Sequence, residues 1–396
     1  MSMACIGICY SGKEESMELA TDLAELCRRA SWWMEFDWLY AACSMQTRSL
    51  GIDELPSELP CDQVLWEAST AFAWSACNPW SDSPPLRHNV SGYLQMVGEE
   101  SSILEQPALD PLDRRLMTLY LSITCESYQQ VLELPHATNV LDHQSITKVQ
   151  SVIQKVSRSI IRLHSGVDLG RTHDINQTIR SRLTMHFCHL TRLSKTMTLV
   201  VKIARIWASS GWGETPLEVD GDHGDASSGS ITLRDALKIR FSQNPQTARE
   251  LAWHAAQILR LHRAYPSNTP HEPLSAFFAG LYLWSFAKYY YTGHGKSELK
   301  GSSKATATRL DSKPSETKLA TTINEKDGWV QCGGRAVLHY VGDLSLAAAP
   351  GKILCECAAI MRQLKIWGIA GRLIDFLIVM LRREEKYTEN IQYAAD

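Results

Sequence analysis

ARELAWHAAQILRLHRAYPSNTPHEPLSAFFAGLYLWSFAKYYY, residues 248–291, is the stretch that decides the fold class of this chain. It predicts two helices joined by a proline-containing turn. In its first half, side chains recur at the spacing of one largely apolar helical face, at Leu251, His254, Ala255, Ile258, Leu259 and His262. Thr247 and Glu250 have the spacing of a capping box, which predicts that the helix starts there. Pro266 and Pro270 are expected to end it, because proline lacks a backbone N–H and restricts the residue before it.

The second predicted helix has Pro273 in its first turn and is apolar on nearly all sides. Its large side chains are Phe277, Phe278, Leu281, Tyr282, Trp284 and Phe286. A helix that is hydrophobic all round is buried, and the aromatic side chains favour a packed core over the lining of a ligand pocket. The uncharged run from Pro273 to Ala287 is shorter than the roughly 20 residues of a membrane span.

Composition places the chain among folded soluble proteins, with 44% hydrophobic and 21% charged residues. The net charge of −3 gives no global reason to expect nucleic-acid binding. Eleven cysteines, an odd number spread thinly, fit reduced thiols better than a disulfide framework. The N-terminal MSMACIGICYSGKEES lacks the basic leader of a signal peptide, so the sequons at Asn89 and Asn176 are read as chance matches. We therefore expect a soluble intracellular protein.

Helical patterns dominate the remaining sequence, and no segment shows convincing strand alternation. We expect further helices over Glu14–Arg29, Trp32–Met45, Leu65–Ala76, Asp110–Leu134, Asp142–His164, Asp174–Ser210 and Leu233–Phe241. Another is predicted from Pro350 to Leu381, with a joint at Gly368 or Gly371 and the charged run RREEK (382–386) closing it. Loops are expected at Leu50–Cys61, Ser81–Val90 and Gly211–Ser230. The predicted fold class is all-α.

The domain organisation follows from one polar stretch. Residues 292–328 hold almost no large apolar side chains, so we expect them to form a disordered linker or loop. On this interpretation, residues 1–291 form the main part of a large irregular helical domain. Residues 329–387 form a C-terminal helical segment that packs on the same domain.

Three blocks of the sequence resemble the regulatory (middle homology) domain of fungal-specific transcription factors, of the type found downstream of C2H2 zinc fingers. Leu55–Trp74, LPSELPCDQVLWEASTAFAW, is similar to the family's Leu-Pro-Cys loop and Leu-Trp-Glu-Ala helix. Residues 248–291 match its His-Ala-Ala-Gln-Ile helix and its Tyr-Pro-x-Asn and Pro-x-Glu-Pro turns. Cys332–Gly371 resembles the terminal Gly-Gly, leucine and Trp-Gly-Ile block, and residues 8–30 fit more loosely.

The resemblance implies an all-helical regulatory module of a nuclear transcription factor without catalytic residues. We accordingly assign no catalytic residue, no cofactor-binding residue and no metal ligand, and the DNA-binding residues are unknown. The chain begins inside the family's domain, so the zinc finger and its zinc are expected upstream. The implied partners are other transcription regulators or a second copy of the chain. DNA would be reached only through the missing finger or a partner's finger, and no membrane is involved.

The cysteines and histidines do not have the spacing of a zinc finger. A zinc finger needs a C-x2–4-C pair followed by H-x3–5-H, but Cys5 and Cys9 are followed by no histidine before His88. His186, Cys188 and His189 share one predicted helix, with positions 186 and 189 on one face. One face of one helix offers too few ligands, which favours a packing or surface role.

The remaining motifs are weaker indications of a functional site. Cys355 and Cys357 lie on different helix faces, which favours small core residues. The run from Asp220 through Asp222 to Asp225 lacks the sixth-position glycine and twelfth-position acid of a calcium loop, so a solvated loop is favoured. Gly293-His-Gly295-Lys does not match a phosphate-binding loop, and no Gly-x-Ser-x-Gly nucleophile motif is present.

The stretch Lys148–Arg205 is basic, with eleven Lys or Arg against Asp168 and Asp174. Phosphate binding is one interpretation, since clustered cations release counterions from DNA. We favour a solvated helix face opposed by the acidic region Glu99–Asp142, and expect only weak, strongly salt-dependent DNA binding.

The leading hypothesis is therefore a transcription regulator, the regulatory part of a fungal RNA polymerase II transcription factor, located in the nucleus. The alternative is a free-standing helical protein–protein interaction module, or a truncated antagonist of related factors, without DNA binding. An enzyme in a helical fold ranks third.

Overall fold

The computed structural model describes residues 38, 70–76, 109, 111–133, 142–164, 175–192, 194–209, 232–266, 272–291, 307–312, 319–364 and 368–395. Helices hold 84% of these residues, which confirms the predicted all-α class. No helix among them is long and apolar enough to cross a membrane. The predicted elements at 14–29, 50–61, 81–90 and 211–230, and nearly all of 32–45, lie outside the described residues.

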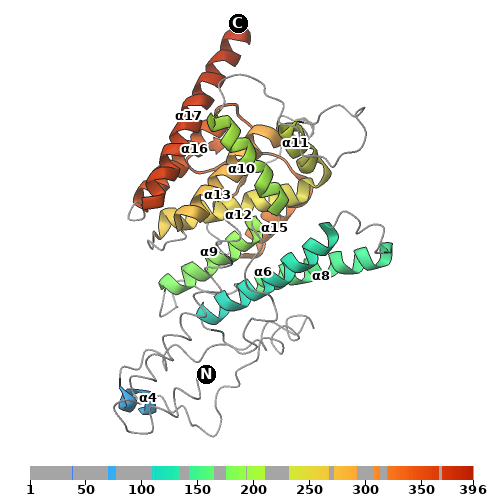
Figure 1. The fold of residues 1–396 in the computed structure, drawn as a ribbon, viewed down its shortest axis with the longest axis vertical. Helices are drawn as coiled ribbons and strands as arrows, with labels where there is room; N and C mark the ends of the chain where they lie inside the picture. The colour runs from blue at the N-terminus through green and yellow to red at the C-terminus, as the bar shows by residue number, and fades with distance from the viewer. Residues whose placement is uncertain are drawn as a thin grey trace. The chain divides into compact units, whose positions relative to one another are not determined.

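The chain divides into two compact units, Met1–Cys188 and His189–Asp396, with the boundary inside a helix. The described helices of the first unit are α4 (Ala71–Ala76), α6 (Pro111–Glu133), α8 (His143–Leu163) and most of α9 (Ile175–Thr191). Those of the second are α10 (Ser194–Ser209), α11 (Leu233–Gln243), α12 (Pro245–Ala264), α13 (Glu272–Ser285), the π-helix η3 (Phe286–Tyr290), α15 (Leu319–Cys332), α16 (Ala349–Gln363) and α17 (Gly368–Ala395) (Figure 1). This division does not coincide with the boundary predicted at residue 291.

In the first unit, α6 and α8 pack along each other. A hydrophobic core combines Met117 and Leu121 of α6 and Ile160 and Leu163 of α8 with Met185 of α9. Asp142 caps α8, because its side chain accepts a 2.6 Å hydrogen bond from the backbone N–H of Ser145. The hydrogen bonds from Ser145 lower the pKa of the Asp142 carboxyl. Both helices begin and end close to the boundaries that the sequence predicts.

Helix α13 forms the centre of the second unit. Every residue of α13 except Leu274 is buried, which confirms the predicted core helix. It packs against α10, α12, α16, α17 and η3. The predicted apolar face of α12 is also confirmed, since all six of its residues are buried.

The start of α12 differs from the prediction. The helix begins at Pro245 rather than at a Thr247 capping box, and no side chain caps it. Proline at the first helical position needs no hydrogen bond for its missing N–H. Glu250, the second member of the predicted box, instead forms an ion pair with Arg192.

The segment predicted as one helix over Asp174–Ser210 is two helices, α9 and α10, with a bend at Arg192. An unbroken helix of this length would extend about 55 Å. The bend allows α10 to pack against α11, α13 and α17.

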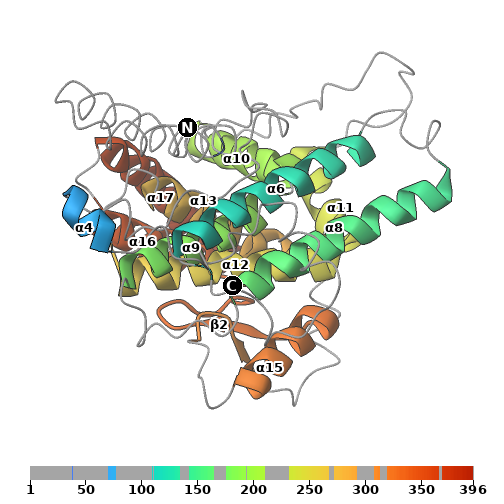
Figure 2. The ribbon, with the colours of Figure 1, turned by 90° about the horizontal axis from the view of Figure 1, so that it is seen from below.

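The prediction of disorder across residues 292–328 is wrong where the structure describes this stretch, at 307–312 and 319–328. Strand β1 (Thr308–Arg309) pairs in parallel with β2 (Ala336–Leu338), and β3 (Gly342–Asp343) pairs antiparallel with β2. Figure 2 shows α15 and β2 lying together below α12, and α15 contacts both α12 and β1. Leu310 and Trp329 anchor the stretch, because both are fully or almost fully buried. The strands are too short to show an alternating pattern in the sequence.

The run RREEK does not close the last helix, because α17 continues to Ala395. One of its acids, Glu384, is only 3% exposed. Its carboxylate accepts hydrogen bonds from Lys288 Nζ at 2.8 and 2.9 Å and from Trp284 Nε1 at 2.8 Å. The Lys288 ammonium also lies over the rings of Trp207 and Tyr387. Burial lowers the pKa of Lys288, and the Glu384 charge opposes that shift.

Close packing of α13 against α16 yields a first prediction. A Cβ atom added at Gly280 would lie 2.9 Å from Cβ of Cys357, and still closer to its sulfur. We expect Gly280→Ala to reduce the free energy of unfolding by about 1–3 kcal/mol, the usual cost of overpacking. Urea denaturation would measure this. Gly371→Ala in α17 is the control. Position 371 is exposed, the added Cβ would contact nothing, and alanine favours helices. Equal destabilisation by the two changes would contradict the packing argument.

The buried ion pair yields a second prediction. Glu384→Gln would leave the Lys288 charge buried without its counter-charge, and we expect a loss of about 3–5 kcal/mol in unfolding free energy. The neighbouring exposed Glu385→Gln makes the same chemical change outside the core and should alter stability little. Thermal and urea unfolding of both variants would test the comparison, and matching midpoints would refute a structural role for Glu384.

Candidate functional site

Three potential ligand side chains converge in the second unit: His189, Glu250 and His254. One donor atom from each lies within 4.8 Å of the other two. Glu250 and His254 are one turn apart on α12, so they share a helical face. His189 comes from the last turn of α9. The two histidines are 1% and 0% exposed, and Glu250 is half-buried.

The two imidazole rings are stacked. Their centroids are 4.2 Å apart and their planes differ by 16°. Trp253 meets the His254 ring edge-on at 4.8 Å. This packing holds both rings away from water.

Arg192 supplies the counter-charge of the cluster. Its guanidinium donates to Oε2 of Glu250 at 2.5 Å, and both side chains are mostly covered. The nearby Tyr282 hydroxyl donates to the backbone carbonyl of Ala248. Burial raises the pKa of Tyr282 well above its ordinary value, while Arg192 lowers it and Glu250 raises it. The cluster therefore combines a carboxylate that is paired with an arginine, a phenol that stays protonated and two stacked imidazoles.

Sequence reasoning placed His189 with His186 and Cys188 on one helix and assigned no metal ligand. All three are buried. The structure brings His189 together with two residues of α12, a juxtaposition that no local spacing could reveal. The i, i+4 pair Glu250 and His254 was the available signal, because that spacing places two ligands on one face.

The two cysteines of the Cys355-x-Cys357 motif lie in different environments. Cys357 is buried as predicted, whereas the prediction of a core position is wrong for Cys355, which is exposed on α16. Cys357 donates its S–H to the carbonyl of Ala276, and burial raises the pKa of its thiol to about 12. It is therefore a packing residue rather than a nucleophile. The motifs at residues 5–9, 88, 220–225 and 293–295 lie outside the described residues.

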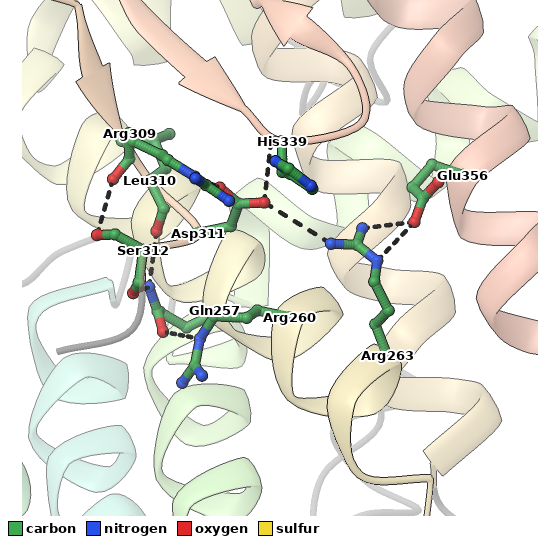
Figure 3. A network of polar contacts seen from close by, with 9 residues as sticks. All are labelled: Gln257, Arg260, Arg263, Arg309, Leu310, Asp311, Ser312, His339 and Glu356. Atoms are coloured by element: carbon green, nitrogen blue, oxygen red, sulfur yellow. Dashed lines mark hydrogen bonds and ion pairs between the residues drawn. The ribbon is translucent and has the colours of Figure 1, made fainter. Parts of the chain in front are cut away.

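A second polar cluster centres on Arg263 (Figure 3). Its guanidinium donates to Glu356 of α16 at 2.8 and 2.5 Å and lies 3.7 Å from Asp311. Asp311 accepts further hydrogen bonds from Arg309 Nε and from the backbone N–H of His339. The adjoining cavity is only about 10 Å³, room for one water at most. These contacts join β1, the β2–β3 turn, α12 and α16, which indicates a structural role.

The same network fixes the strand segment through Gln257. Its side-chain amide donates to the carbonyls of Leu310 and Ser312, and its oxygen accepts from Arg260 (Figure 3). The amide thereby satisfies backbone groups that the short strand leaves open.

The first unit contains a cavity of about 70 Å³. Its lining comprises Leu109, Pro111, Arg114, His164, Thr178, Ser181 and Arg182. His164 Nε2 lies 2.9 Å from the Thr118 hydroxyl. Burial, helped by the charges of Arg114 and Arg182, lowers the pKa of His164 to about 3. This cavity therefore contains a histidine that stays neutral at physiological pH.

Helix α8 presents a cationic face. Lys148, Lys155 and Arg158 are exposed, Arg162 is partly exposed, and residues 143–163 include no Asp or Glu. None of the four cations forms an ion pair with another described residue. The apolar side of the helix packs on α6. The sequence-predicted basic surface is thus accessible to solvent along α8.

Comparisons with protein-family models, with curated proteins and with solved structures each found no match to this chain. The resemblance to fungal transcription factors therefore stays a prediction from the sequence.

The buried histidine of the first unit yields a third prediction. An unfolded chain binds a proton at His164 below about pH 6.5, whereas the folded chain does so only near pH 3. Its contribution to stability is therefore complete above pH 6.5 and declines as the pH falls toward 3, by up to about 1.4 kcal/mol per pH unit. Urea denaturation between pH 4 and 7 should show a shallower pH dependence for His164→Gln. His143→Gln, at an exposed histidine of α8, is the control, and identical slopes for both variants would contradict the prediction.

Proposed function

We propose that this chain is the regulatory part of a fungal RNA polymerase II transcription factor, and that it acts in the nucleus by binding other regulators. The supporting observation is that two sequence blocks behind the family resemblance, 248–291 and 332–371, pack as one helical unit. Helix α13 of the first block meets α16 of the second at Gly280 and Cys357. Arg263 and Glu356 join the same two blocks by an ion pair.

The proposed mechanism is contact between macromolecular surfaces. In the described part of the chain, the exposed face of α8 is the surface best suited to this role, because Lys148, Lys155 and Arg158 place like charges along one helix. Their chemistry fits an acidic surface on a partner regulator. Phosphates of DNA would bind the same cations weakly and with strong salt dependence.

The function is tested by tethering residues 1–396 to a heterologous DNA-binding domain and measuring reporter transcripts in a fungal host. We expect a several-fold change relative to the DNA-binding domain alone. The triple variant Lys148→Gln, Lys155→Gln, Arg158→Gln should weaken that change, because it removes the cationic face of α8. The matched control is Lys352→Gln, Arg362→Gln, Arg372→Gln, which removes equal charge from exposed positions on α16 and α17.

A stably expressed fusion that leaves transcription unchanged would refute the regulatory function. If the fusion still co-purifies with a partner, the alternative of an interaction module or antagonist gains support. Equal effects of the two triple variants would remove α8 as the contact surface. Tight, sequence-specific DNA binding by the purified chain would contradict the expectation that DNA is reached through a separate finger.

A further inference from the structure

We propose that His189, Glu250 and His254 bind one divalent transition-metal ion, of which Zn²⁺ is the representative. The proposal concerns a site inside the second unit and is independent of the proposed regulatory function. It is supported by three donor side chains from two helices, with donor atoms within 4.8 Å of one another. Two of the three side chains are almost completely buried.

The donor set selects the class of ion. Two imidazole nitrogens and one carboxylate oxygen suit Zn²⁺, Ni²⁺, Cu²⁺ or Fe²⁺, whereas Ca²⁺ and Mg²⁺ prefer oxygen ligands throughout. Three protein ligands leave the fourth tetrahedral position of Zn²⁺ for water. Around such an ion, with bonds of about 2.0–2.1 Å, donor atoms lie about 3.3 Å apart. Since the donor atoms lie within 4.8 Å of one another, each pair must approach by about 1.5 Å at most to bind the ion.

The stacked rings define the movement that binding requires. A metal–imidazole bond lies in the plane of the ring, and planes inclined by 16° at a 4.2 Å separation do not meet at one nearby ion. At least one ring must therefore rotate about its Cβ–Cγ bond when the ion enters. The half-buried Glu250 provides the side of the cluster that solvent reaches.

Arg192 orients the carboxylate. It donates a hydrogen bond to Oε2 of Glu250. Hydrogen bonds from such outer partners fix the direction of a ligand carboxylate.

The test uses the purified 396-residue chain, stripped of metal with a chelator and with exposed thiols alkylated. Titration with Co²⁺ alone should give the visible absorption of a tetrahedral nitrogen and oxygen site, at one ion per chain, and Zn²⁺ should displace it. Glu250→Gln, His189→Gln and His254→Gln should each weaken binding by about 10-fold or more. His339→Gln and His143→Gln, both at exposed histidines, should bind like the unaltered chain.

Circular dichroism reports whether the buried histidine variants fold. If they do not, the half-buried Glu250→Gln decides the question, because glutamine keeps the hydrogen bond to Arg192. Unchanged Co²⁺ affinity in folded Glu250→Gln would overturn the proposal. So would the absence of binding, or a near-ultraviolet sulfur-to-cobalt band as the sole signal, since that band reports cysteine ligands.

Discussion

A helix without a polar face must be covered on every side, and α13 imposes this constraint on the second unit. Its residues from Glu272 to Ser285, apart from Leu274, are buried. Exposing such surface costs about 25 cal/mol per Å² of apolar area. Helices from distant parts of the sequence therefore pack against it. In chain order, α10 and α12 precede α13, whereas α16 and α17 follow it near the C-terminal end of the sequence. Because Gly280 has no Cβ, it leaves room for Cys357 of α16.

Covering α13 also buries polar side chains, and these specify which segments meet. Arg249 donates to the carbonyls of Val330 and Gln331 and to the Tyr290 hydroxyl. Basic groups near a helix C-terminus satisfy its last carbonyls, so Arg249 fixes the end of α15. The ion pair between Lys288 and Glu384 joins η3 to α17. An unpaired buried charge is far costlier than a lost apolar contact, so the polar pairs determine the register that hydrophobic packing alone leaves open.

The parts of the fold that local sequence predicts are those that local forces determine. The period of 3.6 residues and the flanking prolines predicted α12 and α13, and the aspartate before α8 marks its start. The errors share a different cause. Strand β1 and helix α15 are ordered by partners elsewhere, with Leu310 and Trp329 as anchors. The bend at Arg192 lets α10 pack against α11, α13 and α17, which lie later in the chain. The approach of His189 to α12 is equally non-local, so composition and spacing could not place it.

Charged residues that are adjacent in the sequence can lie in very different environments. Glu384 and Glu385 are adjacent in the sequence, yet the first is buried against Lys288 and the second faces solvent. The buried Glu384 is matched by the Lys288 charge, and this pair serves the fold. Lys148, Lys155 and Arg158 of α8 are exposed and form no ion pair with another described residue. Glu250 lies between these cases, since it is half-buried, pairs with Arg192 and has a carboxylate oxygen within 4.8 Å of a nitrogen of each of His189 and His254. In such a partly desolvated site, the attraction between a carboxylate and an added cation is stronger than in water.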